Sequence, residues 1–214
     1  MDHDDFAFEP LPGLPAHPPK GETLLWQGSP ATLPLAREAY KLTWVACYFV
    51  LVVLWRASTG YADGGAPIAL AYGLPYAVIG LCACGLIVLL AHWQARTAIY
   101  TITTARVILR IGAALSVTIN LPFKQLLSAS LDKRRNGTGT IAMQIGGDTK
   151  ISYLVCWPHV RPWHLRDVEP ALRCIPEAER VARILSNAAE ARLSVPSVAP
   201  RAAAQAPQGA VPAE

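Results

Sequence analysis

The chain has 214 residues, of which 52% are hydrophobic and 16% charged, and its formal net charge is +4. The charge is unevenly spread, because Met1 to Tyr40 carries two basic and six acidic residues whereas Gln94 to Arg192 carries fourteen basic and seven acidic ones. No nucleic-acid-binding motif accompanies the basic half, and the positions of the five cysteines do not predict an extracellular disulfide framework, which excludes a small disulfide-stapled secreted protein.

The first 39 residues form a predicted arm that ends in a docking segment. Five prolines fall within residues 1–21, which predicts an extended or disordered chain. They are Pro10, Pro12, Pro15, Pro18 and Pro19. The apolar cluster at residues 24–26 is closed by Gly28 and Pro30, which predicts a short strand that ends in a turn and docks on another part of the protein.

Two apolar stretches follow, at Leu42–Trp55 and Ala66–Trp93. The second has no charged side chain before His92, and a helix of about 20 apolar residues crosses the hydrocarbon core of a bilayer, so this stretch spans alone. The first reaches spanning length when it extends over residues 40–57, because Lys and Arg side chains snorkel while Trp and Tyr suit the interface. We therefore predict a two-span transmembrane hairpin over residues 40–93.

Basic residues flank this hairpin on one side only. Beyond Arg56 at the border of the first span, the predicted connecting loop, Ser58 to Pro67, carries Asp63 as its one charged residue. The basic residues before the first span and after the second are Arg37, Lys41, Arg96, Arg106 and Arg110. The positive-inside rule then predicts a multi-pass membrane protein with both termini in the cytoplasm. The acidic arm before the first span favours an uncleaved anchor over a signal peptide.

Beyond the hairpin the apolar pattern changes from continuous to alternating, which is typical of strands. Residues 97–103 and 107–111 predict a β-hairpin, because β-branched and aromatic side chains dominate both. Further strands are predicted at residues 115–121, 126–132, 139–145 and 150–155, with turns at 136–137 and 146–148. Pro176 at a first helical position, followed by apolar residues at helical spacing, predicts a helix that covers the sheet. Its apolar face contains Val181, Ile184, Leu185 and Ala188.

The predicted fold class is therefore a membrane α-helical hairpin plus a small α+β domain. The domain occupies residues 94–193 and is an antiparallel meander closed by its C-terminal helix. Residues 194–214 are rich in Ala, Pro, Gln and Ser, which predicts a disordered tail.

Several segments resemble a known family. Residues 24–30 (LLWQGSP) before a membrane hairpin, with residues 100–103 (YTIT) and 106–108 (RVI) after it, resemble membrane-anchored bacterial PH-like domains. Residues 4–15, 120–123 and 157–163 resemble more closely the photosynthetic complex assembly proteins of purple bacteria.

The resemblance implies a PH-like antiparallel β-barrel or sandwich, a tendency to self-associate and a place in the intracytoplasmic photosynthetic membrane. It also implies a role in assembly of the photosynthetic reaction centre, and it supplies no catalytic motif. The family has been described with three spans, whereas the residues of this chain predict two.

The segment from Cys156 to Cys174 is the predicted partner contact, because it combines aromatic and guanidinium groups, which are enriched in binding hot spots, with prolines that stiffen it. The residues expected to contact a partner are Trp157, His159, Arg161, Trp163 and Arg166. In the alternative interpretation both tryptophans fold back to cap the sheet and the arginines are merely solvated.

Lys133, Arg134 and Arg135 precede a predicted hairpin turn and are the expected lipid contacts, with a simple solvated turn as the alternative. His92, at the cytoplasmic edge of the second span, is a candidate pigment contact or an ordinary interfacial residue, and His159 is a second candidate. We predict neither a metal site nor a cofactor, because no carboxylate or cysteine spacing supports a closed site.

Small residues of the second span, Gly80, Ala83 and Gly85, are expected to let another helix approach closely. No catalytic motif is present, so we predict a non-enzyme. The leading hypothesis is a membrane assembly factor that holds reaction-centre subunits through its spans and its domain, with other assembly factors, lipid and a second copy of the chain as further partners and no nucleic acid. The alternatives are a module that binds anionic lipid and organises the membrane, and a pigment-handling protein.

Overall fold

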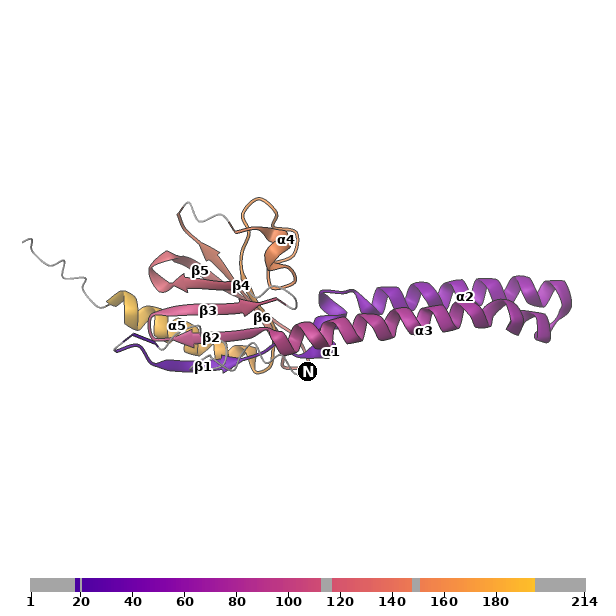
Figure 1. The fold of residues 1–214 in the computed structure, drawn as a ribbon, viewed down its shortest axis with the longest axis horizontal. Helices are drawn as coiled ribbons and strands as arrows, with labels where there is room; N and C mark the ends of the chain where they lie inside the picture. Colours follow the sequence, from indigo (N-terminus) through magenta and orange to yellow (C-terminus); the bar gives the residue numbers. More distant parts are fainter. Residues whose placement is uncertain (1–17, 20, 113–116, 148–150, 195–214) are drawn as a thin grey trace, which may run out of the picture.

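The computed structural model describes residues 18–19, 21–112, 117–147 and 151–194. Within these residues a small α+β domain carries two long helices that extend from it side by side (Figure 1). Most of the predicted proline-rich arm and the predicted tail lie outside the described residues.

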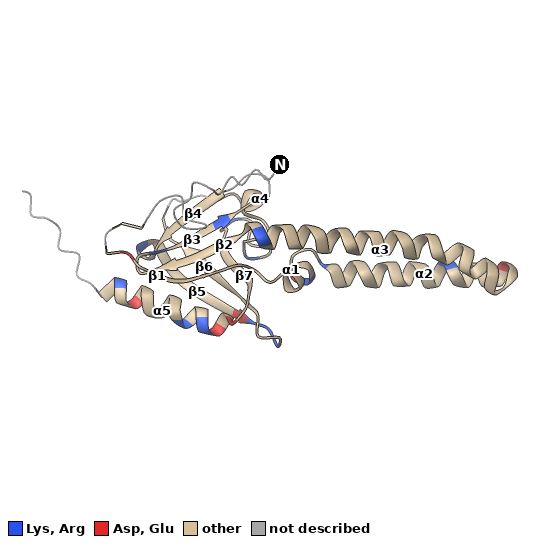
Figure 2. Ribbon diagram, turned by 60° about the horizontal axis from the view of Figure 1, so that its bottom comes forward, with Lys and Arg blue, Asp and Glu red and all other residues tan. Residues whose placement is uncertain are grey.

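The two long helices are α2 (Leu42–Gly64) and α3 (Ala66–Thr97). At about 1.5 Å per residue they are roughly 35 and 48 Å long, against about 30 Å for a bilayer core. The mean hydropathy of an 18-residue window is 1.5 in α2 and 2.4 in α3, so by length and composition both are able to cross a membrane. Figure 2 shows that charged residues gather on the domain and leave most of the helix pair uncharged.

The predicted loop from Ser58 to Pro67 is wrong, because α2 continues to Gly64 and α3 begins at Ala66. Gly65 makes the turn alone with a φ of 76°, a value that suits a residue without a Cβ. The hydroxyls of Ser58 and Thr59 donate to carbonyls one turn back, which keeps these polar residues helical.

The domain contains two antiparallel sheets. The first has the order β1-β2-β3-β4 and the second β5-β6-β7. Their strands are β1 (Leu24–Gly28), β2 (Ile99–Thr103), β3 (Arg106–Ile111), β4 (Val117–Pro122), β5 (Leu126–Lys133), β6 (Gly139–Ile145) and β7 (Ala171–Ile175). The sheets do not close into a barrel, so the predicted PH-like barrel is corrected to two separate sheets.

The remaining helices cover and connect these sheets. They are α1 (Thr32–Glu38), the 3₁₀ helix η1 (Phe123–Gln125), α4 (Tyr153–Cys156) and α5 (Ala178–Ser194). The predicted helical face is confirmed, because Val181, Leu185 and Ala188 of α5 are buried in the main core and Ile184 packs against it. The predicted strand at residues 150–155 is wrong, since its described part, from residue 151, has no strand and enters α4.

The described part of the arm that contains β1 belongs to the domain. β1 pairs antiparallel with β2, with Trp26 opposite Ile102 and Gly28 opposite Tyr100. Glu22, just before β1, forms an ion pair with Arg106 of β3 at 2.6 Å. The helix pair is therefore inserted between two adjacent strands of one sheet, and both of its ends lie at the domain.

Candidate functional site

The helix pair joins the domain through α1, which packs against α3 and β7. Leu35 of α1, Ala95 of α3 and Cys174 of β7 form a small buried cluster of their own. The backbone N–H of Ala31 donates to the carbonyl of Cys174 at 2.8 Å, which fixes the start of α1 on β7. Burial, and then the neighbouring Glu38, raise the pKa of the Cys174 thiol to about 12, so this thiol stays protonated.

A buried polar chain lies beside this cluster. The Nδ1 atom of His159 is 2.5 Å from the Tyr100 hydroxyl, and its Nε2 atom is 3.2 Å from the Gln94 side-chain amide on α3. A neutral imidazole has one donor and one acceptor nitrogen, so these two partners use its whole hydrogen-bonding capacity. The Tyr100 hydroxyl also accepts from the backbone N–H of Arg173 at 3.4 Å.

The surroundings keep His159 uncharged. Its side chain is fully buried, and burial together with the Arg173 charge lowers its pKa to about 3. Its predicted role as a partner contact is therefore wrong, because the ring faces the interior. The same two hydrogen bonds occupy both ring nitrogens, so neither nitrogen is left to bind the metal of a pigment.

Arg173, almost completely buried, extends the chain of contacts to α1. Its Nη1 donates to the Pro158 carbonyl at 3.2 Å, and its Nη2 lies 3.9 Å from a carboxylate oxygen of Glu38. Glu38 in turn pairs with Arg134 at 3.1 Å. These groups border a pocket of about 320 Å³ that Arg161 also lines. One carboxylate of α1 thus ties β7 and the β5–β6 hairpin to the foot of the helix pair.

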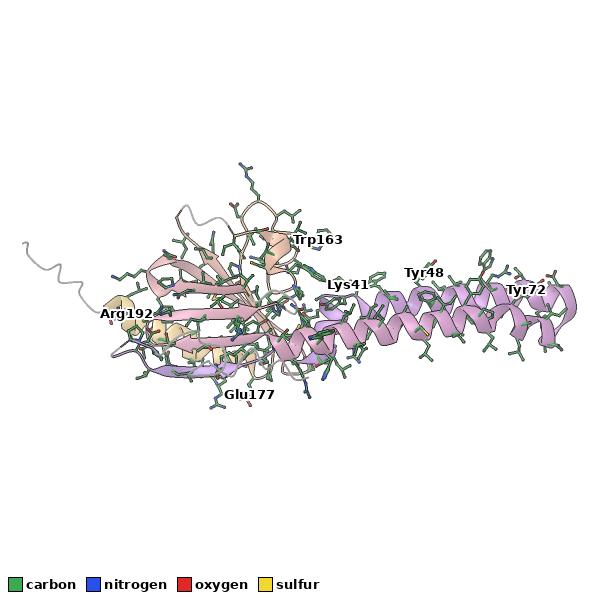
Figure 3. The ribbon with its side chains drawn as sticks, in the orientation of Figure 1. Lys41, Tyr48, Tyr72, Trp163, Glu177 and Arg192 are labelled. Atoms are coloured by element: carbon green, nitrogen blue, oxygen red, sulfur yellow. The ribbon has the colours of Figure 1, made fainter. Side chains whose placement is uncertain are left out.

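The rest of the predicted partner segment is divided between the surface and this junction. The Trp157 ring packs edge-on against Tyr40, immediately before the N-cap of α2, with 5.1 Å between ring centroids. Arg161 pairs with Glu169 at 2.9 Å. Trp163 and Arg166 are exposed, and Figure 3 shows Trp163 at the edge of the domain that faces the helix pair.

The three predicted lipid contacts lie at the tip of the β5–β6 hairpin and are all exposed. Lys133 pairs with Glu179 of α5 at 2.5 Å. Arg134 pairs with Asp132 as well as with the α1 carboxylate described above. Two of these charges therefore already have acidic neighbours within the protein.

Small residues of α3 are partly used within the helix pair. A Cβ at Gly80 would lie 2.7 Å from the Cβ of Phe49 on α2, so Gly80 lets the two helices touch. A Cβ at Gly85 would meet nothing within 4 Å. The predicted close approach of another helix is therefore confirmed at Gly80, where α2 is the helix that approaches.

An apolar groove of about 350 Å³ remains at mid-length on the outside of the pair. Its wall is almost entirely carbon and contains several small side chains. The lining residues are Ala46, Phe49, Val50, Val53, Leu54, Ala77, Gly80, Leu81 and Cys84. His92, the other candidate pigment contact, is exposed on α3.

Arg56 lies within α2, two turns before its end, and not at the border of a span as the sequence indicated. Its guanidinium carbon is 4.9 Å from the ring centre of Tyr72 and 5.7 Å from that of Tyr76. Such cation–π contacts stabilise a charge that has left water. Three or more metal-binding side chains do not gather anywhere in the part of the chain that the structure describes.

The fold, a domain of two antiparallel sheets with a closing helix and an inserted pair of apolar helices, agrees with the comparison of the sequence with family models. The chain belongs to the bacterial PH domain family, whose model matches residues 42–189.

A relative from Rhodobacter capsulatus is 51% identical over 208 residues, which cover 95% of this chain and 97% of the relative, and its name is "Uncharacterized 23.7 kDa protein in puhA 5'region". Among solved structures, a DUF1696-family protein with a pleckstrin-homology domain from Shewanella loihica matches 43% of this chain and 71% of its own length. That match has 12% identity and a TM-score of 0.29.

Proposed function

We propose that this protein is a non-enzymatic membrane assembly factor for the photosynthetic reaction centre of purple bacteria, of the group called PuhB. Its helix pair crosses the inner membrane and holds transmembrane helices of reaction-centre subunits, while the PH-like domain stays at the cytoplasmic surface. The relative named for its position 5′ of puhA supports the link to photosynthesis, as does the resemblance of residues 4–15, 120–123 and 157–163 to this group.

The observation that carries the proposal is the apolar groove on the helix pair. Within a bilayer, helices associate through close packing and not through the hydrophobic effect, so small side chains at a contact favour association. Ala46, Ala77 and Cys84 supply such a surface beside Phe49 and Leu81. A helix of a partner subunit fits this groove better than the remaining surface, where large side chains project outward, as Tyr48 and Tyr72 do in Figure 3.

The connection to the domain gives the helix pair a fixed direction. Because β1 precedes α2 and pairs with β2, which follows α3, the two ends of the pair face the same side of any membrane that it crosses. The junction around His159 and Glu38 then holds the domain next to the partner helices, where its surface meets the cytoplasmic part of the same complex.

The groove is tested by filling it. Ala77→Leu places a large side chain in the groove, whereas Val78→Leu, next to it on the exposed surface, leaves the groove open. Affinity purification of the tagged protein from phototrophically induced membranes, followed by mass spectrometry, should recover reaction-centre subunits with the wild type and V78L and at least tenfold less with A77L. Equal recovery with all three contradicts the groove, and absence of these subunits from the wild type contradicts the assembly role.

The two alternative functions receive less support. Lipid binding through the hairpin tip is weakened by the acidic partners of Lys133 and Arg134. Pigment binding through His159 is opposed by its burial and its two occupied ring nitrogens. A pigment role then depends on His92 alone, and it predicts a visible absorption band in the protein purified from pigmented cells.

A further inference from the structure

The segment at residues 153–165 exposes an unusual number of large apolar side chains. Leu154, Trp163 and Leu165 are 85%, 86% and 66% exposed, and Val155 and Trp157 are also exposed. Contiguous apolar surface on a soluble domain marks a contact with another molecule or with a membrane. Leu154, Trp163 and Leu165 do not line the helix groove and are not among the junction residues described above.

The segment lies where the helix pair leaves the domain. Trp157 packs against Tyr40, two residues before the start of α2. His159 contacts Gln94 in the last turn of α3. The segment is thus attached to the foot of each helix, and Figure 3 shows Trp163 on the same side of the domain as Lys41.

The inner side of this segment is firmly held, which forces its apolar residues outward. Cys156 and Val160 are buried in the main core, and Val160 also forms a β-bridge with Pro170. The chain then turns at Trp163, whose φ is 65°. These buried residues hold the segment in place, while Leu154, Trp163 and Leu165 stay on the surface.

A bilayer is the partner that this position favours. If α2 and α3 cross a membrane, the foot of the pair lies at the lipid–water boundary, where Trp is enriched and where Leu and Val reach the acyl chains. Lys41 at the start of α2 and Arg96 in the last turn of α3 are both exposed at this foot of the helix pair. Their positive charges suit anionic headgroups.

We propose that residues 153–165 are a membrane-inserting anchor whose Leu154, Trp163 and Leu165 side chains enter the lipid boundary beside the helix pair. The anchor supplies a third point of attachment and so fixes the tilt of the PH-like domain over the bilayer. This inference rests on the proposed membrane span of α2 and α3, and it leaves the identity of the assembled complex open.

The test uses the full-length protein in nanodiscs of phosphatidylcholine and phosphatidylglycerol. A photoreactive benzoylphenylalanine is placed at one position at a time: 163 and 165 in the anchor, Leu193 as a control, and Leu81 in the spanning part of α3. Leu193 is a matched control because it is 62% exposed and stands at the end of α5, far from the helix pair (Figure 1). Mass spectrometry measures lipid adducts after illumination.

The anchor predicts at least tenfold more lipid adduct at positions 163 and 165 than at 193, with strong adduct at 81. Adduct at 81 with equal, low adduct at 163, 165 and 193 overturns the anchor and leaves the proposed membrane span intact. Loss of adduct at 81 overturns the membrane span itself. The same variants illuminated in native membranes overturn the lipid assignment if position 163 yields protein adducts in place of lipid adducts.

Discussion

Acid should destabilise the domain between pH 7 and 5 through His159. The folded state holds this imidazole neutral, with a pKa of about 3, because of burial and the nearby Arg173 charge. In the unfolded chain the pKa returns to about 6.5. Below pH 6.5 the unfolded state therefore binds a proton that the folded state does not bind, so stability falls as the pH decreases toward 3 and is constant above about 7.

The expected loss in the free energy of unfolding follows from this difference in proton binding between the folded and unfolded states. The free energy of unfolding changes by up to about 1.4 kcal/mol per pH unit for one proton, and integration from pH 7 to pH 5 gives a loss of about 2 kcal/mol. Most carboxylates titrate below this window. For Glu22, burial raises the pKa, but the hydrogen bonds from Arg106 and Thr103 outweigh it and hold the pKa below its usual value.

Urea unfolding of the full chain in detergent micelles, followed by far-ultraviolet circular dichroism at pH 5, 6 and 7, measures this loss. His159→Gln is the matched control, because its amide retains a hydrogen-bonding group near Tyr100 but does not titrate. H159Q should be less stable than the wild type at pH 7 and should lose most of the pH dependence. The same slope in both proteins, or a wild type equally stable at pH 5 and 7, would refute the assignment of a neutral, buried histidine.

Three further results are expected. Gly80→Val should weaken the helix pair by about 1–3 kcal/mol through overpacking against Phe49. Gly85→Val, where a Cβ meets nothing within 4 Å, should not weaken it. Disulfide crosslinking between α2 and α3 in detergent compares the two variants. Glu22→Gln should cost roughly 1–3 kcal/mol, since it weakens charged hydrogen bonds to β3, and equal hydrogen-exchange protection of β1 in both proteins would contradict this. Cys174, with a pKa raised to about 12, should react with maleimide at pH 8 at least tenfold faster in urea than in the folded protein.

The helix pair and α5 were predictable because their signals are local. A long apolar run or an apolar repeat at helical spacing is visible within a few turns, and it needs no knowledge of distant partners. The hairpin of β2 and β3 was predictable for the same reason. The connection at Gly65 was not, because Ser58 and Thr59 resemble loop residues until their hydroxyls bond to the helix backbone.

The elements of the junction were missed because their signals are distant or contradictory. α1 has only seven residues and contains Pro34, and its stability comes from packing on α3 and β7. β7 contains Arg173, a charged residue that does not suggest a buried strand. Sequence patterns alone do not show that Glu38, far away in the chain, accompanies the arginine.

The contrast between local and distant signals also explains why the prediction for the partner segment was only partly right. Its composition indicated a contact surface, but composition does not separate the residues that point inward from those that point outward. His159 turned inward because Tyr100 and Gln94, both about 60 residues away, supply its partners. Trp163 remained outside, so the segment contributes to both the junction and the surface.

The insertion of the helix pair between β1 and β2 links the packing of α2 on α3 to completion of the domain. β1 and β2 are separated by about 70 residues of sequence, and bringing the ends of so long a flexible segment together costs conformational entropy. Antiparallel packing of α2 on α3 holds these ends close together and so lowers this cost. A variant that opens the pair, such as Gly80→Val, should therefore weaken the docking of β1 as well, although Gly80 lies far from the sheet. By this argument, packing of α2 on α3 stabilises the pairing of β1 with β2, in addition to the proposed role of the helix pair in the membrane.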